Sequence, residues 1–536
     1  MSKHDSKMAD EAYATTRRQL LKAGGLLIPA AAVAPGIFLR TARAATAVGF
    51  DYYISPTGSD SNPGTLAQPW AITAINTKQS AYAGKRLGLL PGTYRVSSLM
   101  GTNENVAALT IAGGSGSSSQ TYIGSADSSG IYARGTATLQ ANDNGFYGGS
   151  NGNESPIMAA RAGANYWTVD GLRFTGFSMW AFHVGDSPSG GACITGWTIQ
   201  NCEFTGGNDL SNTASNGVNC GVIIVYASIN GLVTNNWFHD NVGSADTQHW
   251  SCVYQWGLGN TPTAGNVYTY NTIVKSGNLH GKEASQYNTE IAYNYIDMTG
   301  TLSTSEYCGA AIMGFMADGG SAGGTATKWH HNVICANGMA LDFNNDNPTH
   351  SYTDSPLYIY NNTVVMVGQK TNGFVCGGYD GSGTGHQVSA YNNLYYDNGQ
   401  GANEYGYWLT NTDAFKLCDY NIYGTWNSFS TVAPGANTSA GMTSHNSLSA
   451  WSSAIGGLEA HSSTSSASPF ASTGLDALKY QVTSSSLAYD AGRVGGTVSG
   501  AICHVGAWDG TVTQIGCNFA NGAVAVLPDA PALSVS

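Results

Sequence analysis

A short motif recurs through the middle of the chain and constrains the fold more than any other feature. An apolar residue and two intervening positions precede an Asn, and an aromatic or β-branched segment follows it. The copies contain Asn201, Asn235–Asn236, Asn271, Asn294, Asn332, Asn361–Asn362, Asn392–Asn393 and Asn421. The tightest spacing is 23 positions, from Asn271 to Asn294. Repeats of this length predict a solenoid, in which short strands stack coil over coil to bury a common core.

The Asn residue itself suits such a coil. Asn tolerates the left-handed backbone conformation, so we expect it to turn the strand sharply. Stacked Asn side chains can also hydrogen bond to each other and to the turn backbone. Apolar runs such as 221–226 and 251–255 follow Gly-marked turns and are typical of strands. The sequence therefore predicts an all-β fold.

Composition excludes several other classes. Of the 536 residues, 42% are hydrophobic and only 10% are charged, which excludes a disordered chain and a coiled coil. The net charge of −12 provides no basic face for nucleic acid. The ten Cys residues contain no CxxC pair, so a zinc finger is not expected. Cys503 with Cys517 and, less closely, Cys193 with Cys202 are the pairs that could form disulfides. We expect a monomer.

Residues 1–44 predict a twin-arginine signal peptide. Thr16-Arg17-Arg18-Gln19-Leu20-Leu21-Lys22 precedes an apolar run over 23–39, and small residues at 42–44 suit a signal peptidase. A transmembrane anchor is the alternative, but the run is short for a bilayer span. We expect export to the periplasm or the extracellular space, with no span in the mature chain. That mature chain keeps 14 Lys and Arg against 30 Asp and Glu residues, a net charge of −16.

Both ends of the remaining chain add to the repeat pattern. Residues 52–70 and Leu90-Pro91-Gly92-Thr93-Tyr94-Arg95 look like an opening cap and first coil, and residues 484–492 with 505–508 look like a closing run that lacks its usual Pro. The chain resembles the right-handed parallel β-helix proteins of the pectate-lyase-like superfamily, which are secreted polysaccharide-active enzymes. The resemblance implies a right-handed parallel β-helix over 45–429 with an N-terminal cap. Residues 430–536, rich in Ser, Ala and Gly, would form the last coils and a C-terminal cap.

The resemblance also implies that the strand after each Gly-marked turn belongs to the sheet that bears the substrate cleft. These strands should cover 180–184, 222–226, 252–256, 279–283, 310–314, 339–344 and 374–379. Alternate side chains of a strand point outward. The expected outward set is His183, Tyr254, Trp256, His280, Lys282, Asp342 and Asn344, with Leu279, Leu341 and Phe343 pointing inward.

The leading hypothesis is a lyase that cleaves a uronate-containing glycan by β-elimination. Lys282 would be the base, because a Lys amine with a lowered pKa can remove a proton, and His280 and Glu283 lie beside it. A solvated Lys282 paired with an acid is an equally open interpretation. Asp342 and Asp346 are candidate Ca²⁺ ligands, with Arg161 and Arg173 as alternatives for neutralising the uronate. His183, Tyr254, Trp256, Asn344 and Tyr379 are the candidate sugar-binding residues.

Two other functions stay open. A glycoside hydrolase would need two carboxyl groups about 5–10 Å apart, for which Glu283, Asp318 and Asp342 are available. A glycan-binding protein without chemistry is the third possibility. The strongly negative charge disfavours a polyanionic substrate unless a bound cation reverses the local sign, so the glycan could also be neutral.

Overall fold

The computed structural model describes most of the repeats and both flanking regions. The described residues are 49–101, 105–141, 155–177, 180–186, 193–207, 220–241, 250–256, 263–276, 278–281, 286–298, 311–315, 327–336, 340–344, 357–366, 375–377, 388–397, 407–409, 415–424, 429–432, 442–470, 479–488, 491–492 and 507. The chain divides into two units, and all of these residues belong to the larger one, Thr46–Leu527 with Ser534–Ser536. The predicted signal peptide, 1–44, lies outside them.

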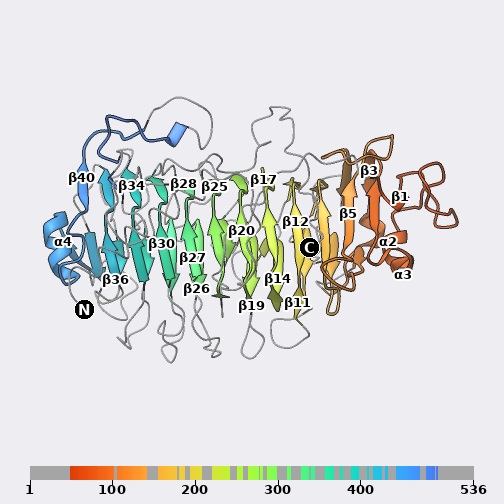
Figure 1. The fold of residues 1–536 in the computed structure, drawn as a ribbon, viewed down its shortest axis with the longest axis horizontal. Helices are drawn as coiled ribbons and strands as arrows, with labels where there is room; N and C mark the ends of the chain where they lie inside the picture. The colour runs from red at the N-terminus through yellow and green to blue at the C-terminus, as the bar shows by residue number, and fades with distance from the viewer. Residues whose placement is uncertain are drawn as a thin grey trace, which may run out of the picture. The chain divides into compact units, whose positions relative to one another are not determined.

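Three long sheets make up the described structure (Figure 1). The first sheet contains β1 (Tyr52–Ile54), β2 (Arg86–Leu89), β5 (Thr121–Ser125), β8 (Trp167–Asp170), β12 (Trp197–Gln200), β16 (Leu232–Thr234), β20 (Val267–Thr269), β24 (Glu290–Ala292), β27 (Thr327–His330), β30 (Leu357–Tyr360), β33 (Val388–Tyr391) and β36 (Phe415–Asp419).

The second sheet contains β3 (Gly92–Arg95), β6 (Ala137–Gln140), β9 (Arg173–Thr175), β13 (Glu203–Thr205), β17 (Trp237–His239), β21 (Thr272–Val274), β25 (Tyr295–Asp297), β28 (Val333–Ala336), β31 (Thr363–Met366), β34 (Leu394–Asp397), β37 (Ile422–Gly424) and β40 (Ser463–Ser465).

The third sheet contains β4 (Leu109–Ile111), β7 (Met158–Ala160), β10 (Phe182–Val184), β14 (Cys220–Tyr226), β18 (Trp250–Trp256), β22 (Asn278–Gly281), β26 (Ile312–Phe315), β29 (Leu341–Asn344), β32 (Val375–Gly377), β35 (Tyr407–Leu409), β38 (Phe429–Val432) and β39 (Met442–His445). A small fourth sheet joins β11 (Ile194–Thr195), β15 (Ser228–Ile229), β19 (Thr263–Ala264) and β23 (Gln286–Tyr287).

Successive coils place one strand in each long sheet, so neighbouring strands in a sheet come from neighbouring coils. In one coil, β18, β20 and β21 lie in the third, first and second sheets. Each of these strands pairs in parallel with its equivalent in the next coil. The predicted parallel β-helix is therefore confirmed. Among the described pairs of the long sheets, β38 with β39 is antiparallel, which ends the third sheet.

The interior is filled by side chains that stack coil over coil. Phe174, Phe204 and Phe238 form one column with ring centroids 4.9 Å apart. Trp167 stacks on Trp197 and on Phe182, which comes from the third sheet. Burying one such side chain contributes about 1.5–3 kcal/mol. Strands too short to be stable alone therefore share one continuous core.

The recurrent Asn residues form a buried ladder. Each side-chain amide donates to the side-chain oxygen of the next Asn at 3.0–3.2 Å. The members are Asn236, Asn271, Asn294, Asn332, Asn362, Asn393 and Asn421, all of them buried. The predicted amide-to-amide bonding is confirmed, and all the bonds run in the same direction along the axis.

The left-handed turn residue is an Asn, as predicted, in the copies of Asn201, Asn235, Asn361 and Asn392, which have φ of 52–56°. In other copies it lies one position before the ladder Asn. Asn271, Asn294 and Asn332 are not left-handed; the residues before them, Tyr270, Tyr293 and His331, have φ of 55°, 58° and 54°. A ladder Asn must instead keep its own amide directed along the axis. The turn conformation therefore falls on the preceding residue even where that residue is aromatic, because coil stacking holds it there.

The two ends differ from the coils. Short helices α2 (Ala74–Thr77) and α3 (Gln79–Tyr82) and the 3₁₀ turn η1 (Ser97–Leu99) lie near the first strands. At the other end α4 (Leu448–Ala454) buries Trp451 against Phe429, with ring centroids 5.5 Å apart. Later residues return over the outer face of the second sheet, where Tyr480 and Ala507 pack beside Val333 and Val365. No helix in the described part of the chain is long and apolar enough to cross a membrane.

Candidate functional site

The outer face of the third sheet carries three of the predicted site residues in one row. Phe182 contacts Trp167 inside the coils, so the row that contains Phe182 faces the interior. The adjacent row therefore faces outward. His183 follows Phe182 and pairs with Ile224, which in turn pairs with Tyr254, so His183 and Tyr254 belong to the outward row. Leu341 pairs with Ile312 of the inward row, so the next residue, Asp342, also faces outward. The predicted outward positions of these three residues are confirmed.

The strand β22 has the opposite alternation to the one predicted. His280 pairs with Val253 and Ile312 of the inward row, and Gly281 pairs with Tyr254 of the outward row. The backbone of His280 therefore occupies a position of the inward row, which contradicts its predicted outward position. A register difference of one residue exchanges the two faces of a strand. Pairing between coils sets that register, and the local sequence of β22 does not show it.

Several other predicted residues lie outside the described residues. These are Lys282, Glu283, Asp346 and Tyr379. The backbones of Trp256 and Asn344 pair with Tyr226 and Phe315, and so occupy positions of the outward row. Their roles stay predictions.

Arg161 and His183 form the central polar contact of this face. Nη1 of Arg161 lies 3.2 Å from Nδ1 of His183 and donates to the backbone oxygen of Gly185 at 3.4 Å. A guanidinium can only donate, so Nδ1 accepts and the neutral imidazole carries its proton on Nε2. Nη1 also lies 3.9 Å from a carboxylate oxygen of Asp186. These contacts hold the positively charged guanidinium of Arg161 at the outer face of β7 and β10.

Arg173 lies elsewhere. It belongs to β9 of the second sheet, and its Nε lies 3.2 Å from Oε1 of Glu203. Of the two Arg residues proposed for uronate binding, only Arg161 shares a face with His183, Tyr254 and Asp342.

The outward row is covered by protein. His183, Tyr254 and Asp342 are 0%, 1% and 2% exposed. The ring of Tyr226 meets that of His183 edge-to-face at 5.1 Å, and Trp180 lies 6.4 Å from Tyr254. Electrostatic interactions are stronger in such a desolvated setting than in water.

The described residues contain no group of three or more His, Cys, Asp or Glu side chains arranged to hold a metal. Of the two predicted Ca²⁺ ligands, only Asp342 lies among the described residues. Cys202 carries a free, buried thiol, so the proposed disulfide between Cys193 and Cys202 does not form.

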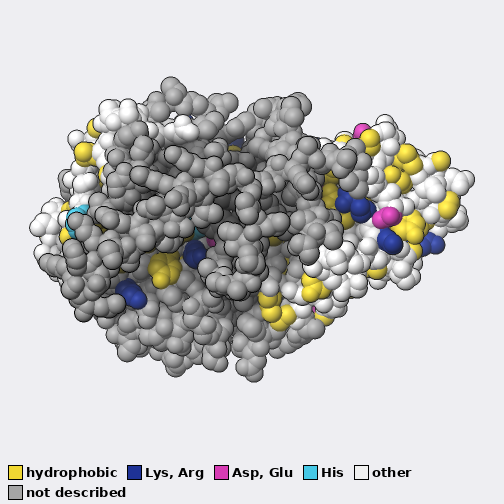
Figure 2. All heavy atoms as spheres, viewed as in Figure 1, with side chains coloured by type: hydrophobic (Ala, Val, Ile, Leu, Met, Phe, Trp, Pro, Cys, Tyr) yellow, Lys and Arg dark blue, Asp and Glu magenta, His cyan; other side chains and the backbone are white. Residues whose placement is uncertain are grey.

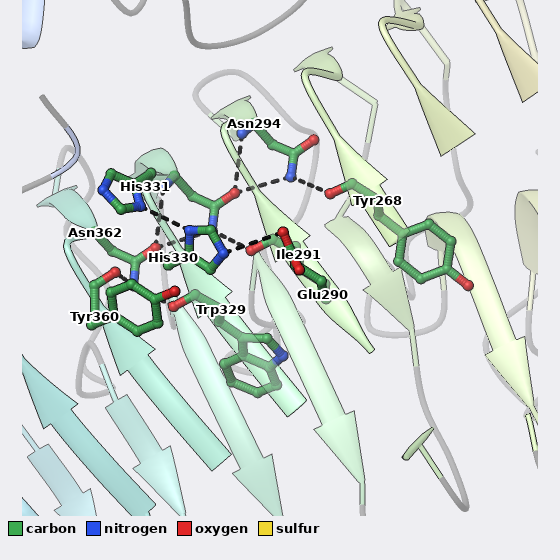
Figure 3. A network of polar contacts seen from close by, with 10 residues as sticks. Tyr268, Glu290, Ile291, Asn294, Trp329, His330, His331, Tyr360 and Asn362 are labelled. Carbon is green, nitrogen blue, oxygen red and sulfur yellow. Dashed lines mark hydrogen bonds and ion pairs between the residues drawn. The ribbon is translucent and has the colours of Figure 1, made fainter. Parts of the chain in front are cut away.

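A second polar network, which the sequence analysis missed, lies on the first sheet (Figure 3). Nε2 of His330 lies 3.4 Å from Oε1 of Glu290, and Nδ1 of His330 lies 2.8 Å from Nδ1 of His331. Burial lowers the pKa of His330 to about 4, and the contact with His330 lowers the pKa of Glu290. The adjacent His residues before the ladder residue Asn332 were the signal in the sequence.

Comparison with known proteins finds solved structures that resemble this chain at low sequence identity. No family model matches the chain, and no curated protein matches it. A pectate lyase structure is 15% identical, with 85% of this chain and 96% of that chain covered and a TM-score of 0.49. A rhamnogalacturonan lyase is 16% identical, with 64% and 81% covered and a TM-score of 0.37. The A-module of a mannuronan C-5 epimerase from Azotobacter vinelandii is 11% identical, with 69% and 93% covered and a TM-score of 0.35. The parallel stacking of strands in the three long sheets defines the class of this chain as a parallel β-helix protein.

Proposed function

We propose that this protein is an exported polysaccharide lyase that binds a uronate-containing glycan along the outer face of the third sheet. The observation that carries the proposal is the row of His183, Tyr254 and Asp342 on that face, with Arg161 against His183. Neighbouring strands lie about 4.8 Å apart. Along the row, Tyr254 lies two strands from His183, and Asp342 lies three strands from Tyr254.

The proposed chemistry is β-elimination. A base removes the proton from the carbon beside the uronate carboxyl group, the electron pair forms a carbon–carbon double bond, and the glycosidic oxygen leaves. Lys282, which directly follows β22 in the sequence, is the proposed base. Arg161 is the proposed partner of the uronate carboxylate, because a fixed guanidinium stabilises the charge that develops next to it. His280 is not assigned a role on this face.

Calcium binding by Asp342 and Asp346 stays a separate proposal, and no step above depends on it. A chelator would lower the activity if a cation neutralises the substrate, and added Ca²⁺ would restore it.

Hydrolysis is the second candidate, because Asp342 supplies a carboxyl group on this face. It requires a second carboxyl group about 5–10 Å away, for which Glu283 is the proposed partner.

A panel of acidic and neutral polysaccharides tests the function. A lyase releases products that absorb in the near ultraviolet, a hydrolase releases reducing ends without that absorbance, and a binding protein releases neither. We expect absorbance, and a loss of at least about a hundredfold in kcat for Lys282→Ala. Lys275→Ala, an exposed Lys on the preceding coil, is the matched control. Full activity of Lys282→Ala would show that Lys282 is not the base. Release of reducing ends without the absorbance would contradict the lyase and favour the hydrolase.

Export through the twin-arginine pathway is tested with residues 1–44 fused to a reporter. We expect the double variant Arg17→Lys and Arg18→Lys to retain the reporter in the cytoplasm. Unchanged export of this variant would contradict the proposal.

A further inference from the structure

The outer face of the first sheet carries a line of three polar side chains. Glu290 of β24, Lys328 of β27 and Tyr358 of β30 occupy the same register position in successive coils. All three are half-buried, while the following residues Ile291, Trp329 and Ile359 are buried in the interior. A carboxylate, an ammonium group and a phenol therefore follow one another at about 4.8 Å per coil.

A column of rings runs beside this line. His330 stacks on Tyr360 at 4.6 Å, and Tyr360 stacks on Tyr391 at 5.2 Å, with interplanar angles of 13° and 6°. Tyr360 and Tyr391 are half-buried. Figure 2 views this face and shows hydrophobic, Lys or Arg, acidic and His side chains close together, over the region where Figure 1 places β20, β27 and β30.

The network in Figure 3 fixes the protonation state and the orientation of Glu290. Glu290 has a lowered pKa and is ionised at neutral pH, so its carboxylate accepts and Nε2 of His330 carries the proton. His330 is neutral above pH 4, so its Nδ1 accepts from Nδ1 of His331. Both imidazoles thus orient one half-exposed carboxylate before any ligand arrives, and such preorganisation favours binding.

This face differs from the outer face of the second sheet. There, the C-terminal residues Tyr480 and Ala507 cover Val333 and Val365 through apolar contacts. The line of Glu290, Lys328 and Tyr358 alternates charge and hydroxyl instead. Its carboxylate and the net charge of −12 of the chain oppose a nucleic acid.

We propose that Glu290, Lys328, Tyr358 and Tyr360 form a second glycan-binding site, separate from the third sheet, for an extended polysaccharide chain. Glu290 accepts hydrogen bonds from sugar hydroxyls, Lys328 and Tyr358 donate to hydroxyl or ring oxygens, and Tyr360 supplies ring contact. The site would hold the polymer while the third sheet acts on another part of it. The choice of a glycan rests on the proposed function.

Native electrophoresis through gels that contain xylan or polygalacturonate tests the site. We expect the wild-type protein to be retarded in at least one gel. The double variant Glu290→Gln with Tyr358→Ala should bind about tenfold more weakly, because each lost polar contact contributes a modest part of the affinity. Lys328→Gln, which leaves Glu290 and His330 in place, should also weaken binding. Lys416→Gln, an exposed Lys on β36 of the same sheet, is the matched control and should leave it unchanged.

The thermal midpoint of each variant and turnover of short oligosaccharides complete the test. We expect folded variants with unchanged turnover of short substrates. Absence of retardation in both gels, equal binding by folded variants, or parallel loss of binding and short-substrate turnover would each overturn the site. Weaker binding of the variants together with a wild-type protein that releases no product would support the site and contradict the proposed enzyme.

Discussion

The side-chain amide of Asn421 ends the Asn ladder on the carboxylate of Glu459. Nδ2 of Asn421 lies 3.3 Å from Oε2 and 3.5 Å from Oε1 of Glu459. Since every amide of the ladder donates toward this end, the last one needs an acceptor. Glu459 is buried and also accepts from Cys418 at 2.8 Å and from the hydroxyl groups of Tyr423 and Ser462. A single carboxyl group thus terminates the Asn ladder.

Replacing Glu459 should therefore destabilise the C-terminal coils. We expect Glu459→Ala to lower the free energy of unfolding by about 3 kcal/mol, because several buried donors lose their acceptor. Glu459→Gln should cost less, since its amide oxygen still accepts. Urea unfolding followed by circular dichroism measures both values. Equal stability of Glu459→Ala and the wild-type protein would contradict this role.

A substitution in the middle of the ladder should also be costly. Asn294 donates to Asn332 and to the backbone oxygen of Tyr268, and accepts from Asn271. Asn294→Ala leaves these buried groups unsatisfied and should lower the free energy of unfolding by about 2–4 kcal/mol. The exposed Asn446 offers the control, and Asn446→Ala should change stability by less than about 0.5 kcal/mol. Similar effects of the two substitutions would argue against an energetic role for the ladder.

Stability should decrease on acidification through the His330 network. The folded protein protonates His330 only near pH 4, whereas the unfolded chain does so near pH 6.5. The unfolded state therefore holds more protons between these values, and stability is lost as the pH falls through this window, by at most about 3 kcal/mol. Glu290, with its lowered pKa, acts in the same direction, and Lys328, His331, Tyr293 and Tyr360 are the other groups around His330.

Thermal melts at pH 7 and pH 4.5 measure this dependence. We expect His330→Gln to flatten it, because the buried imidazole that the unfolded chain protonates more readily is then absent. An unchanged slope in His330→Gln would show that other groups cause the loss of stability.

Two Arg residues provide a paired test of the active face. Arg161 lies beside His183 on the third sheet, and Arg173 lies beside Glu203 on the second. If the substrate binds the third sheet, Arg161→Ala should lower kcat/KM by about a hundredfold, and Arg173→Ala should leave it unchanged. Steady-state assays on the substrate found in the panel measure both. A larger loss in Arg173→Ala would move the active face to the second sheet.

The solenoid and its Asn ladder could be predicted from the sequence because their signals are local. Each coil repeats the same short pattern around residues such as Asn294 and Asn332, and burying an amide in the same place in every coil requires that repetition. The outward positions of His183, Tyr254 and Asp342 followed from simple alternation along their strands. The strands begin two positions away from the predicted 180, 252 and 339, and a shift of two preserves the alternation.

The register of β22 and the His330 network were decided only by the tertiary structure. Pairing with Val253 and Ile312 places His280 on the inward row, and segments of unequal length between the coils hide that pairing from the sequence. The contact between Glu290 and His330 joins residues 40 positions apart that only coil stacking brings together. Local spacing determines what each coil is, whereas the alignment of one coil on the next determines which side chains meet.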